Sequence, residues 1–335
     1  MTTRTRRIAA GLTLAWTVAC SNAAGPKSTA CATGSGGTTG SDSSISWRRV
    51  TVPTGQRLSA VKMTGIATGV AVGDSGTYLI YGGGNSWAAE NVGPTRGVEN
   101  FYGVEATAAG EVWIVGDSGL VLHAPTLTGG WVQQTTNVGV TLFAVWHAGT
   151  ELFAAGNGGV IIHSTNDGAN WSTLAGPTSD TLMAIAGPKD SVLLAVGAGG
   201  VGAAYDGSIW SVDQTGTSVD LRALGTAADT SHSLTDVWAV GDHGTIIHSA
   251  SGASGTWSAQ TSGSTQSLFA IAVDSSAHAL VAGAGGTILH WDGAVWRVMS
   301  TPTHADLRGV ARGLSAPVDY WAVGSCGTVL HGTGS

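Results

Sequence analysis

The sequence predicts an all-β fold, a seven-bladed β-propeller with four strands in each blade. Three observations support this prediction. The chain of 335 residues contains 52 glycines and 13 tryptophans, whereas only 10% of its residues are charged. Seven of the tryptophans recur at intervals of 39 to 47 residues, at Trp47, Trp87, Trp131, Trp171, Trp210, Trp257 and Trp296. A glycine-rich and apolar repeat of that length is typical of a propeller blade.

Each repeat contains the same series of predicted strands. The first strand begins with a large apolar residue, at Leu58, Phe101, Leu142, Leu182, Leu221, Leu268 and Leu307. The second strand ends at a glycine, at Gly73, Gly116, Gly156, Gly197, Gly241, Gly283 and Gly324, and another glycine follows three residues later. The third strand runs to a His or Tyr, and the repeated tryptophan opens the fourth. We expect both glycines to provide the positive φ angles that a tight hairpin needs.

The ends of the repeat predict how the ring closes. The predicted strands are almost continuous apolar runs, such as residues 142–146, which indicates that both faces of each sheet are buried. Stacked propeller blades provide this burial, whereas a β-helix would leave its two ends uncapped. The repeats begin with the fourth-strand Trp47 and end with a third strand at Leu330. The N-terminal strand is therefore expected to complete the seventh blade.

The first residues of the chain predict export. A basic start precedes an apolar run that ends at Ala19, and this is the layout of a signal peptide over residues 1–19. The run is too short to cross a membrane as a helix, which takes about 20 apolar residues. The sequence of residues 17–20, TVAC, resembles a bacterial lipobox, so we expect Cys20 to be lipidated. The alternative is cleavage after Ala23, which would remove Cys20.

Residues 20–45 predict a flexible linker, because they are mainly Ser, Thr, Gly and Ala with almost no charge. The propeller is expected over residues 46–335. If Cys20 is lipidated or removed, Cys31 and Cys326 remain as an even pair in an exported chain, where disulfides persist. A bridge between these two cysteines would pin the linker to the last blade, and the alternative is two independent thiols.

One turn between the predicted third and fourth strands resembles a known family motif. The sequence STNDGANW, residues 164–171, resembles the Asp-box of BNR-repeat propellers at Ser164, Asn166, Gly168 and Trp171. Weaker copies of the form Asp-Gly-x-x-Trp begin at Asp206 and Asp292. Over residues 47–335 the chain is similar to photosystem II assembly-factor propellers and to sialidase-like exported bacterial propellers. The resemblance implies a propeller in which the Asp-box is structural and lies away from the ligand face.

Charged residues near the starts of first strands form the candidate ligand site. They are Arg57, Arg222 and Arg308, with Asp220 and Asp306 two residues before the last two arginines. These strand starts are expected at the mouth of the central channel. Residues two apart on a strand share a face, so each Asp can form a local ion pair with its Arg, worth under about 1 kcal/mol. The alternative is a polar ligand patch that also includes Arg96 and Tyr102.

Other patterns do not predict catalysis or a metal. Five histidines recur at one position of the blade, at His123, His163, His248, His290 and His331. Equivalent positions of different blades point outward around a ring, so they cannot converge on one ion. The chain has no C-x-x-C zinc spacing and no G-x-S-x-G, P-loop or H-E-x-x-H motif. The Arg-Ile-Pro element that opens sialidases is also absent. We therefore expect no metal and no cofactor, and binding rather than catalysis.

The charge balance limits the partners. Lys and Arg number 14 against 21 Asp and Glu, for a formal net charge of −7, so nucleic acid and anionic lipid are not expected partners. We predict an exported, lipid-anchored monomer at the outer membrane or cell surface, which touches the membrane only through its anchor. It would be a scaffold for a protein or glycan partner in the cell envelope, bound by the loops between blades, the longest being residues 91–100, and by the second-to-third-strand turns. The alternatives are a periplasmic or secreted form, a glycan-active enzyme such as a sialidase-like or other glycosidase, and a structural envelope component.

Overall fold

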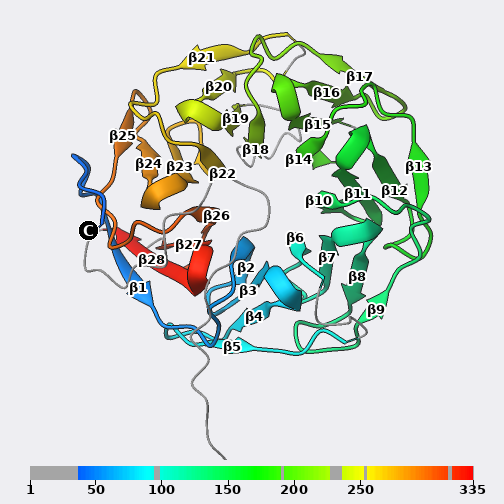
Figure 1. The fold of residues 1–335 in the computed structure, drawn as a ribbon, viewed down its shortest axis with the longest axis horizontal. Coiled ribbons are helices and arrows are strands. Elements are labelled where there is room, and N and C mark those ends of the chain that lie inside the picture. The colour runs from blue at the N-terminus through cyan, green and yellow to red at the C-terminus, as the bar shows by residue number, and fades with distance from the viewer. Residues whose placement is uncertain are drawn as a thin grey trace, which may run out of the picture.

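The computed structural model describes residues 37–93, 99–189, 192–226, 236–252, 255–315 and 319–334. These residues form 28 strands in seven four-stranded antiparallel sheets, which stand around a common axis as propeller blades (Figure 1). The helical residues in these ranges lie in seven three-residue 3-10 turns. A helix long and apolar enough to cross a membrane does not occur in the described part of the chain. The predicted all-β, seven-bladed fold is confirmed.

Each blade begins at the axis and ends at the rim, and we number the blades 1 to 7 in chain order. The innermost strands are β2 (Leu58–Gly65), β6 (Phe101–Ala106), β10 (Leu142–Ala148), β14 (Leu182–Lys189), β18 (Leu221–Thr226), β22 (Leu268–Ser275) and β26 (Leu307–Arg312). The second strands are β3 (Thr68–Gly73), β7 (Val112–Gly116), β11 (Glu151–Gly156), β15 (Val192–Gly197), β19 (Val237–Gly241), β23 (His278–Gly283) and β27 (Asp319–Gly324). The third strands are β4 (Tyr78–Tyr81), β8 (Val121–Ala124), β12 (Ile161–Ser164), β16 (Gly202–Tyr205), β20 (Ile246–Ser249), β24 (Ile288–Trp291) and β28 (Thr328–Gly334). The rim strands are β5 (Trp87–Ala89), β9 (Val132–Gln133), β13 (Ser172–Leu174), β17 (Trp210–Asp213), β21 (Ser258–Gln260), β25 (Trp296–Val298) and β1 (Ile45–Val50).

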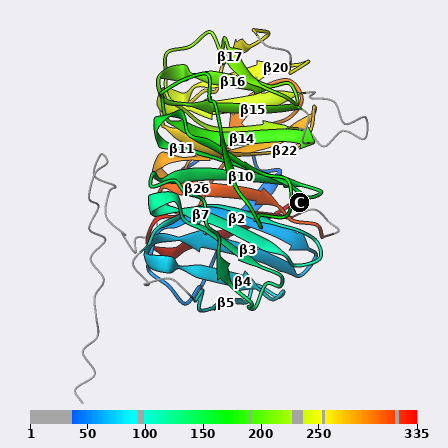
Figure 2. The same ribbon diagram turned by 90° about the vertical axis from the view of Figure 1, so that its right-hand side faces the viewer.

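The ring has two different faces, and Figure 2 shows it edge-on with strands running between them. One face carries the second-to-third-strand turns and the loops that lead from each rim strand to the next blade, and we call it the turn face. Its 3-10 turns are η1 (Asp74–Gly76), η2 (Asp117–Gly119), η3 (Asn157–Gly159), η4 (Ala198–Gly200), η5 (Asp242–Gly244), η6 (Ala284–Gly286) and η7 (Ser325–Gly327). The opposite face carries the turn between the first and second strands of each blade and, in blades 1 to 6, the turn between the third strand and the rim strand, and we call it the hairpin face.

The N-terminal strand closes the ring, as the repeat predicts. Strand β1 is the rim strand of blade 7 and pairs antiparallel with β28, from Ile45 opposite Gly334 to Val50 opposite Val329. The first and last strands of the propeller therefore belong to one sheet. Because a closed ring leaves no blade without a neighbour, every blade buries both faces of its sheet.

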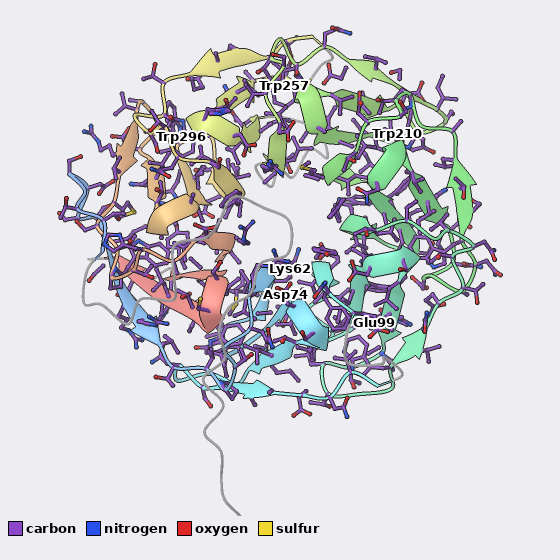
Figure 3. All side chains as sticks on the ribbon, viewed as in Figure 1. Lys62, Asp74, Glu99, Trp210, Trp257 and Trp296 are labelled. Atoms are coloured by element: carbon purple, nitrogen blue, oxygen red, sulfur yellow. The ribbon has the colours of Figure 1, made fainter. Side chains whose placement is uncertain are left out.

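The repeated tryptophans join neighbouring blades. Trp87 of blade 1 packs edge-on against Trp321 of blade 7, with ring centres 5.5 Å apart. Trp296 of blade 6 packs in the same way against Trp238 of blade 5, at 5.3 Å. The tryptophans labelled in Figure 3 lie away from the axis, whereas Asp74 of η1 lies beside it. These contacts make the tryptophans part of the core, because edge-to-face aromatic pairs add to the burial of large apolar surfaces.

The paired glycines of each turn do not both serve the purpose that the sequence suggests. In η2, Gly119 has a φ of +74°, as expected. Gly116, the glycine that ends β7, is extended with a φ of −165°. Its role is close approach, because a Cβ there would lie 2.3 Å from the carbonyl oxygen of Asn100. The expectation of positive φ at the first glycine is therefore wrong, and contact with the start of the innermost strand replaces it.

Residues 37–44, predicted as part of the flexible linker, pack against the rim of blade 6. We call this segment the N-terminal strap. Asp42 forms a parallel bridge with Met299 just beyond β25, and the amide of Thr301 donates to the carbonyl of Thr38 at 3.0 Å. A Cβ on Gly37 would lie 1.5 Å from the carbonyl oxygen of Thr301. Glycine here permits contact rather than flexibility, which explains why composition alone suggested a longer linker.

Candidate functional site

A β-bulge near the start of every innermost strand creates the candidate site. In all seven blades the pairing of the innermost strand with its neighbour shifts register between its first and third residues. The first residue packs between blades with 0% exposure in each case. A bulge re-aims the side chain of the residue that it leaves unpaired, so the second residue is free to turn toward the axis at the turn face.

These seven second residues form what we call the axial ring, in the order in which the blades surround the axis. The ring consists of Ser59, Tyr102, Phe143, Met183, Arg222, Phe269 and Arg308. All seven are partly exposed. The innermost strands that carry them stand side by side around the axis in Figure 1. A single surface therefore combines two guanidinium groups with three aromatic rings and a thioether.

Neighbouring members of the axial ring touch one another. The rings of Tyr102 and Phe143 lie 5.2 Å apart in an edge-on arrangement. Arg222 Nη1 lies 3.5 Å from the sulfur of Met183. The guanidinium carbon of Arg308 lies 4.4 Å from the centre of the Phe269 ring, which is the geometry of a cation–π contact. Arg222 and Arg308 are thus each held against an apolar neighbour in the ring.

Arg308 retains unused hydrogen-bonding capacity. Its Nη2 donates to Asp306 Oδ2 at 3.2 Å, but its buried Nε has no acceptor within the described residues. Burial lowers the pKa of the Arg308 guanidinium, and the positive charges of Arg57 and Arg222 lower it further. The three arginines are therefore close enough to repel one another. An anion placed beside them would relieve this repulsion.

The other two arginines bind aspartates of the 3-10 turns. Arg57 donates from Nη2 to Asp74 Oδ1 at 2.6 Å. Arg222 donates from Nη2 to Asp242 Oδ2 at 2.6 Å, while Asp220, its predicted partner, is more distant at 3.3 Å. Burial would raise the pKa of the Asp242 carboxyl, but the hydrogen bond and charge of Arg222 outweigh burial and hold that pKa below its ordinary value.

Asp220 and Asp306 also connect neighbouring blades. Asp220 of blade 5 accepts a hydrogen bond from the amide of Gly199 in η4 of blade 4, at 2.7 Å. Asp306 of blade 7 accepts one from the amide of Gly285 in η6 of blade 6, at 3.1 Å. Each carboxylate therefore satisfies a turn amide as well as its arginine, so these residues support the site instead of presenting free acceptors to a ligand.

Tyr102 is oriented by the turn of its own blade. Its hydroxyl donates to Asp117 Oδ1 at 3.1 Å, and the amide of Asn100 donates to Asp117 Oδ2 at 2.9 Å. Burial raises the pKa of Tyr102, and the negative charge of Asp117 raises it further. The phenol therefore stays neutral at ordinary pH and presents the apolar face of its ring.

The structure brings most, but not all, of the predicted polar patch together. Tyr102, Arg222 and Arg308 are members of the axial ring, and Arg57 lies two positions before Ser59, the ring member of blade 1. Arg96 lies outside the described residues. Sequence reasoning missed the other members, Ser59, Phe143, Met183 and Phe269. The signal was present, because each follows directly after the apolar residue that begins a first strand.

The Asp-box lies on the hairpin face and holds a turn together. Ser164 Oγ accepts a hydrogen bond from the amide of Gly168 at 3.0 Å, and Asn166 Oδ1 accepts one from the amide of Asn170 at 2.9 Å. Trp171 follows and is 8% exposed. In the weaker copy that begins at Asp206, the carboxylate accepts the amides of Ser208 and Ile209, both at 2.9 Å. The motif therefore forms hydrogen bonds within its own turn, far from the axial ring.

The remaining predicted groups do not join the axial ring. The repeated histidines lie on the third strands, one in each of five blades. Among the described residues, no three His, Cys, Asp or Glu side chains are placed to hold a metal ion. Cys326, in η7, is disulfide-bonded. Cys20 and Cys31 lie outside the described residues, so the pairing of Cys326 with Cys31 and the lipidation of Cys20 stay predictions.

Comparison with known proteins places this geometry among related propellers. The family model described as photosynthesis system II assembly factor YCF48 matches residues 40–290. A structure of YCF48 bound to a D1 peptide is similar with a TM-score of 0.70 and 18% identity, over 88% of this chain and 97% of the other. YCF48 from Cyanidioschyzon merolae is similar with a TM-score of 0.69 and 17% identity, over 85% and 98%. The WD40 β-propeller domain of Doa1 is similar with a TM-score of 0.65 and 12% identity, over 85% and 95%. No curated protein matches the sequence.

Proposed function

Since this chain belongs to the family of photosynthesis system II assembly factor YCF48, we propose that it is a protein-binding propeller that holds a peptide segment of its partner on the axial ring. A YCF48 has been solved bound to a D1 peptide, which shows that one propeller of this fold binds a peptide. The observation that carries the proposal is the pairing of each ring arginine with an apolar neighbour, Arg222 with Met183 and Arg308 with Phe269.

The chemistry of the axial ring favours a particular kind of peptide. A carboxylate would accept hydrogen bonds from the partly exposed guanidinium of Arg308. Charge-assisted hydrogen bonds of this kind are about twice as strong as neutral ones. An apolar side chain next to that carboxylate would pack on Phe143 or Tyr102. We therefore expect a segment with an acidic side chain or a free carboxyl terminus beside an apolar residue.

Short synthetic peptides test this proposal. A peptide library is made twice, with free carboxyl termini and with amidated termini, and the purified chain is applied to both. We expect binding to peptides that combine a carboxylate with an apolar residue, and loss of about tenfold or more in affinity for the Arg222→Ala/Arg308→Ala variant. Comparison of the two libraries distinguishes a terminal carboxylate from an acidic side chain.

Arg297→Ala is the matched control for loss of positive charge. Arg297 is an exposed arginine on the rim of blade 6, paired with Asp292 at 2.8 Å. The Arg297→Ala variant should bind peptides as the wild type does. The proposal is wrong if peptides that bind the wild type bind the double variant equally well, or if Arg297→Ala weakens them as much. Absence of any bound peptide would also overturn it and would leave a structural role for the propeller.

The position of the chain in the cell is a separate part of the proposal. The basic start, the apolar run to Ala19 and the lipobox-like sequence that ends at Cys20 support export and a lipid anchor. The proposal also takes the propeller to be a monomer in the envelope. Radiolabelled palmitate should enter the wild type and not Cys20→Ser. Equal labelling of the two would remove the anchor and favour cleavage after Ala23.

The glycan-active alternative has less support at the axial ring. Binding of a carboxylate sugar by three arginines would need three guanidinium groups that are available to one ligand. Arg57 and Arg222 are instead engaged with the turn aspartates Asp74 and Asp242 at 2.6 Å. Only a ligand able to displace those carboxylates could use all three arginines, so a peptide that uses Arg308 first is the simpler interpretation.

A further inference from the structure

Four blades share an internal pair of side chains that blade 6 lacks. The third-strand histidine of blades 2, 3, 5 and 7 is bound through Nε2 by a carboxylate located 12 residues earlier in its own blade. The pairs are His123 with Glu111, His163 with Glu151, His248 with Asp236 and His331 with Asp319. The repeat therefore shows, four times over, that a partly buried histidine at this position takes an acidic partner.

Blade 6 has the histidine without the acid. Its third-strand histidine is His290, and the residue 12 positions earlier is His278. The ring of His278 lies 4.5 Å from that of His290, and its Nδ1 binds a different carboxylate, Asp274, at 3.1 Å. The side chain of His290 is only 8% exposed. Blade 6 on its own would leave a buried histidine facing another histidine.

The N-terminal strap supplies a carboxylate at the other nitrogen of the His290 ring, Nδ1. His290 Nε2, the nitrogen that binds the acid in the other four blades, is buried without a hydrogen-bond partner among the described residues. Asp42 Oδ2 lies 2.6 Å from His290 Nδ1, and the Asp42 side chain is also 8% exposed. The amide of Ser44 donates to the other oxygen, Asp42 Oδ1, at 2.8 Å. Burial would raise the pKa of the Asp42 carboxyl, but the hydrogen bonds from Ser44 and His290 outweigh burial and hold that pKa below its ordinary value. Asp42 is therefore ionised at neutral pH.

We propose that the N-terminal strap is a latch for closure of the ring, and that Asp42 is the positioning residue that fixes it on blade 6 by binding Nδ1 of His290, the third-strand histidine that has no acidic partner within its own blade. The strap leads directly into β1, which completes blade 7. The N-terminal strap and β1 are thus attached to two adjacent blades, the strap to blade 6 and β1 to blade 7. When β1 separates from β28, a docked strap keeps it nearby, and the high effective concentration favours re-pairing over unfolding. This inference does not depend on peptide binding at the axial ring.

The surroundings of His290 provide a matched control. Asp292 and Arg297 line the same surface hollow as Asp42 and His290. Arg297 Nε donates to Asp292 Oδ2 at 2.8 Å, so these two charges satisfy each other and not His290. Asp292→Asn removes one negative charge beside the strap without touching the latch. Asp42→Asn removes the charge on the latch while its side-chain oxygen can still accept the amide of Ser44.

Hydrogen exchange of the full chain tests the latch. The readout is the protection of the amides that join the strap to blade 6, namely those of Asp42 and Thr301, which bind the carbonyls of Val298 and Thr38. We expect Asp42→Asn to lower this protection by roughly tenfold or more, because a buried charge-assisted hydrogen bond is lost. Asp292→Asn should leave it unchanged. Equal protection in Asp42→Asn and the wild type would overturn the proposal, as would equal loss in both variants.

The pH dependence of hydrogen-exchange protection distinguishes a strap held by the charge of Asp42 from a strap held by backbone contacts alone. A carboxyl whose pKa is lowered on folding stabilises the docked strap at neutral pH, and this stabilisation is lost as pH falls through the folded pKa. After correction for intrinsic exchange rates, protection in the wild type should fall toward that of Asp42→Asn below about pH 4, while the variant shows no such step. The same acid response in both chains would mean that backbone pairing alone holds the strap, and the latch would be rejected.

Discussion

The first and second residues of the innermost strands are neighbours in the chain, yet the seven repeats treat them in opposite ways. The first residue is leucine in six blades and phenylalanine in one, and it is fully buried in all of them. The second residue is Ser, Tyr, Phe, Met, Arg, Phe and Arg in turn, and it is partly exposed in all of them. Each first residue meets the same packing constraint between two blades. The second residues share one surface around the axis, so their identities are free to differ. In this repeat fold, the position that agrees between copies is the one with a shared packing constraint, and the position that differs is the one partly exposed at the axis.

The largest expected effect is on stability, when the first and second residues of one innermost strand, in blade 6, are replaced one at a time. Leu268→Ala removes a residue with 0% exposure and should lower the free energy of unfolding by about 3 kcal/mol. Phe269→Ala removes a partly exposed ring that lies 4.4 Å from the Arg308 guanidinium, and should cost about 1 kcal/mol or less. Urea denaturation measures both changes.

Peptide binding should respond in the reverse order. On the folded protein, Leu268→Ala should leave the affinity for a library peptide unchanged, whereas Phe269→Ala should weaken it because Arg308 loses its supporting ring. If both variants weaken binding equally, the axial ring is not distinct from the core that supports it, and the comparison between the two positions fails.

Much of the fold follows from the sequence because the repeat reports the same constraint seven times. The spacing of Trp87, Trp171 and the other repeated tryptophans predicts the blades, and Trp47 predicts the closing strand. The axial ring is harder to predict, since Phe143 and Met183 resemble ordinary core residues until the register shift at the start of each strand is known. The strap escapes prediction for a different reason. Gly37 is required by close backbone approach, which composition cannot distinguish from flexibility.

A second test compares agreeing and differing positions within one 3-10 turn. The third residue of every turn is glycine, whereas the middle residue varies, and in η3 the two are Gly159 and Gly158. Both have positive φ, +68° and +67°. A Cβ on Gly159 would lie 2.0 Å from the carbonyl oxygen of Thr178, whereas a Cβ on Gly158 would meet nothing within 4 Å.

Alanine at these two sites should therefore have unequal costs. Gly158→Ala should lower the free energy of unfolding by about 1 kcal/mol through left-handed strain alone. Gly159→Ala should cost at least about 2 kcal/mol, because the same strain is joined by a clash that moves the loop of the next blade. Thermal unfolding of the two variants measures the difference. Equal losses of unfolding free energy in the two variants would show that the third residue of every turn is glycine because of its backbone conformation, and not because of contact between blades.

The smallest expected effect concerns the first residue of the 3-10 turn, where copies also differ. Asp242 occupies this place in blade 5, whereas Ala198 and Ala284 occupy it in blades 4 and 6, so the turn itself needs no acid. Asp242 instead binds Arg222 at 2.6 Å. A double-mutant cycle of Asp242→Asn and Arg222→Ala should give a coupling energy of about 0.5 to 1 kcal/mol at pH 7. Because the pKa of Asp242 is lowered on folding, its stabilisation is present at neutral pH and is lost as pH falls below about 4. A coupling energy that persists unchanged at pH 3 would mean that shape, and not charge, holds Arg222, and the arginine would then be oriented by Met183 alone.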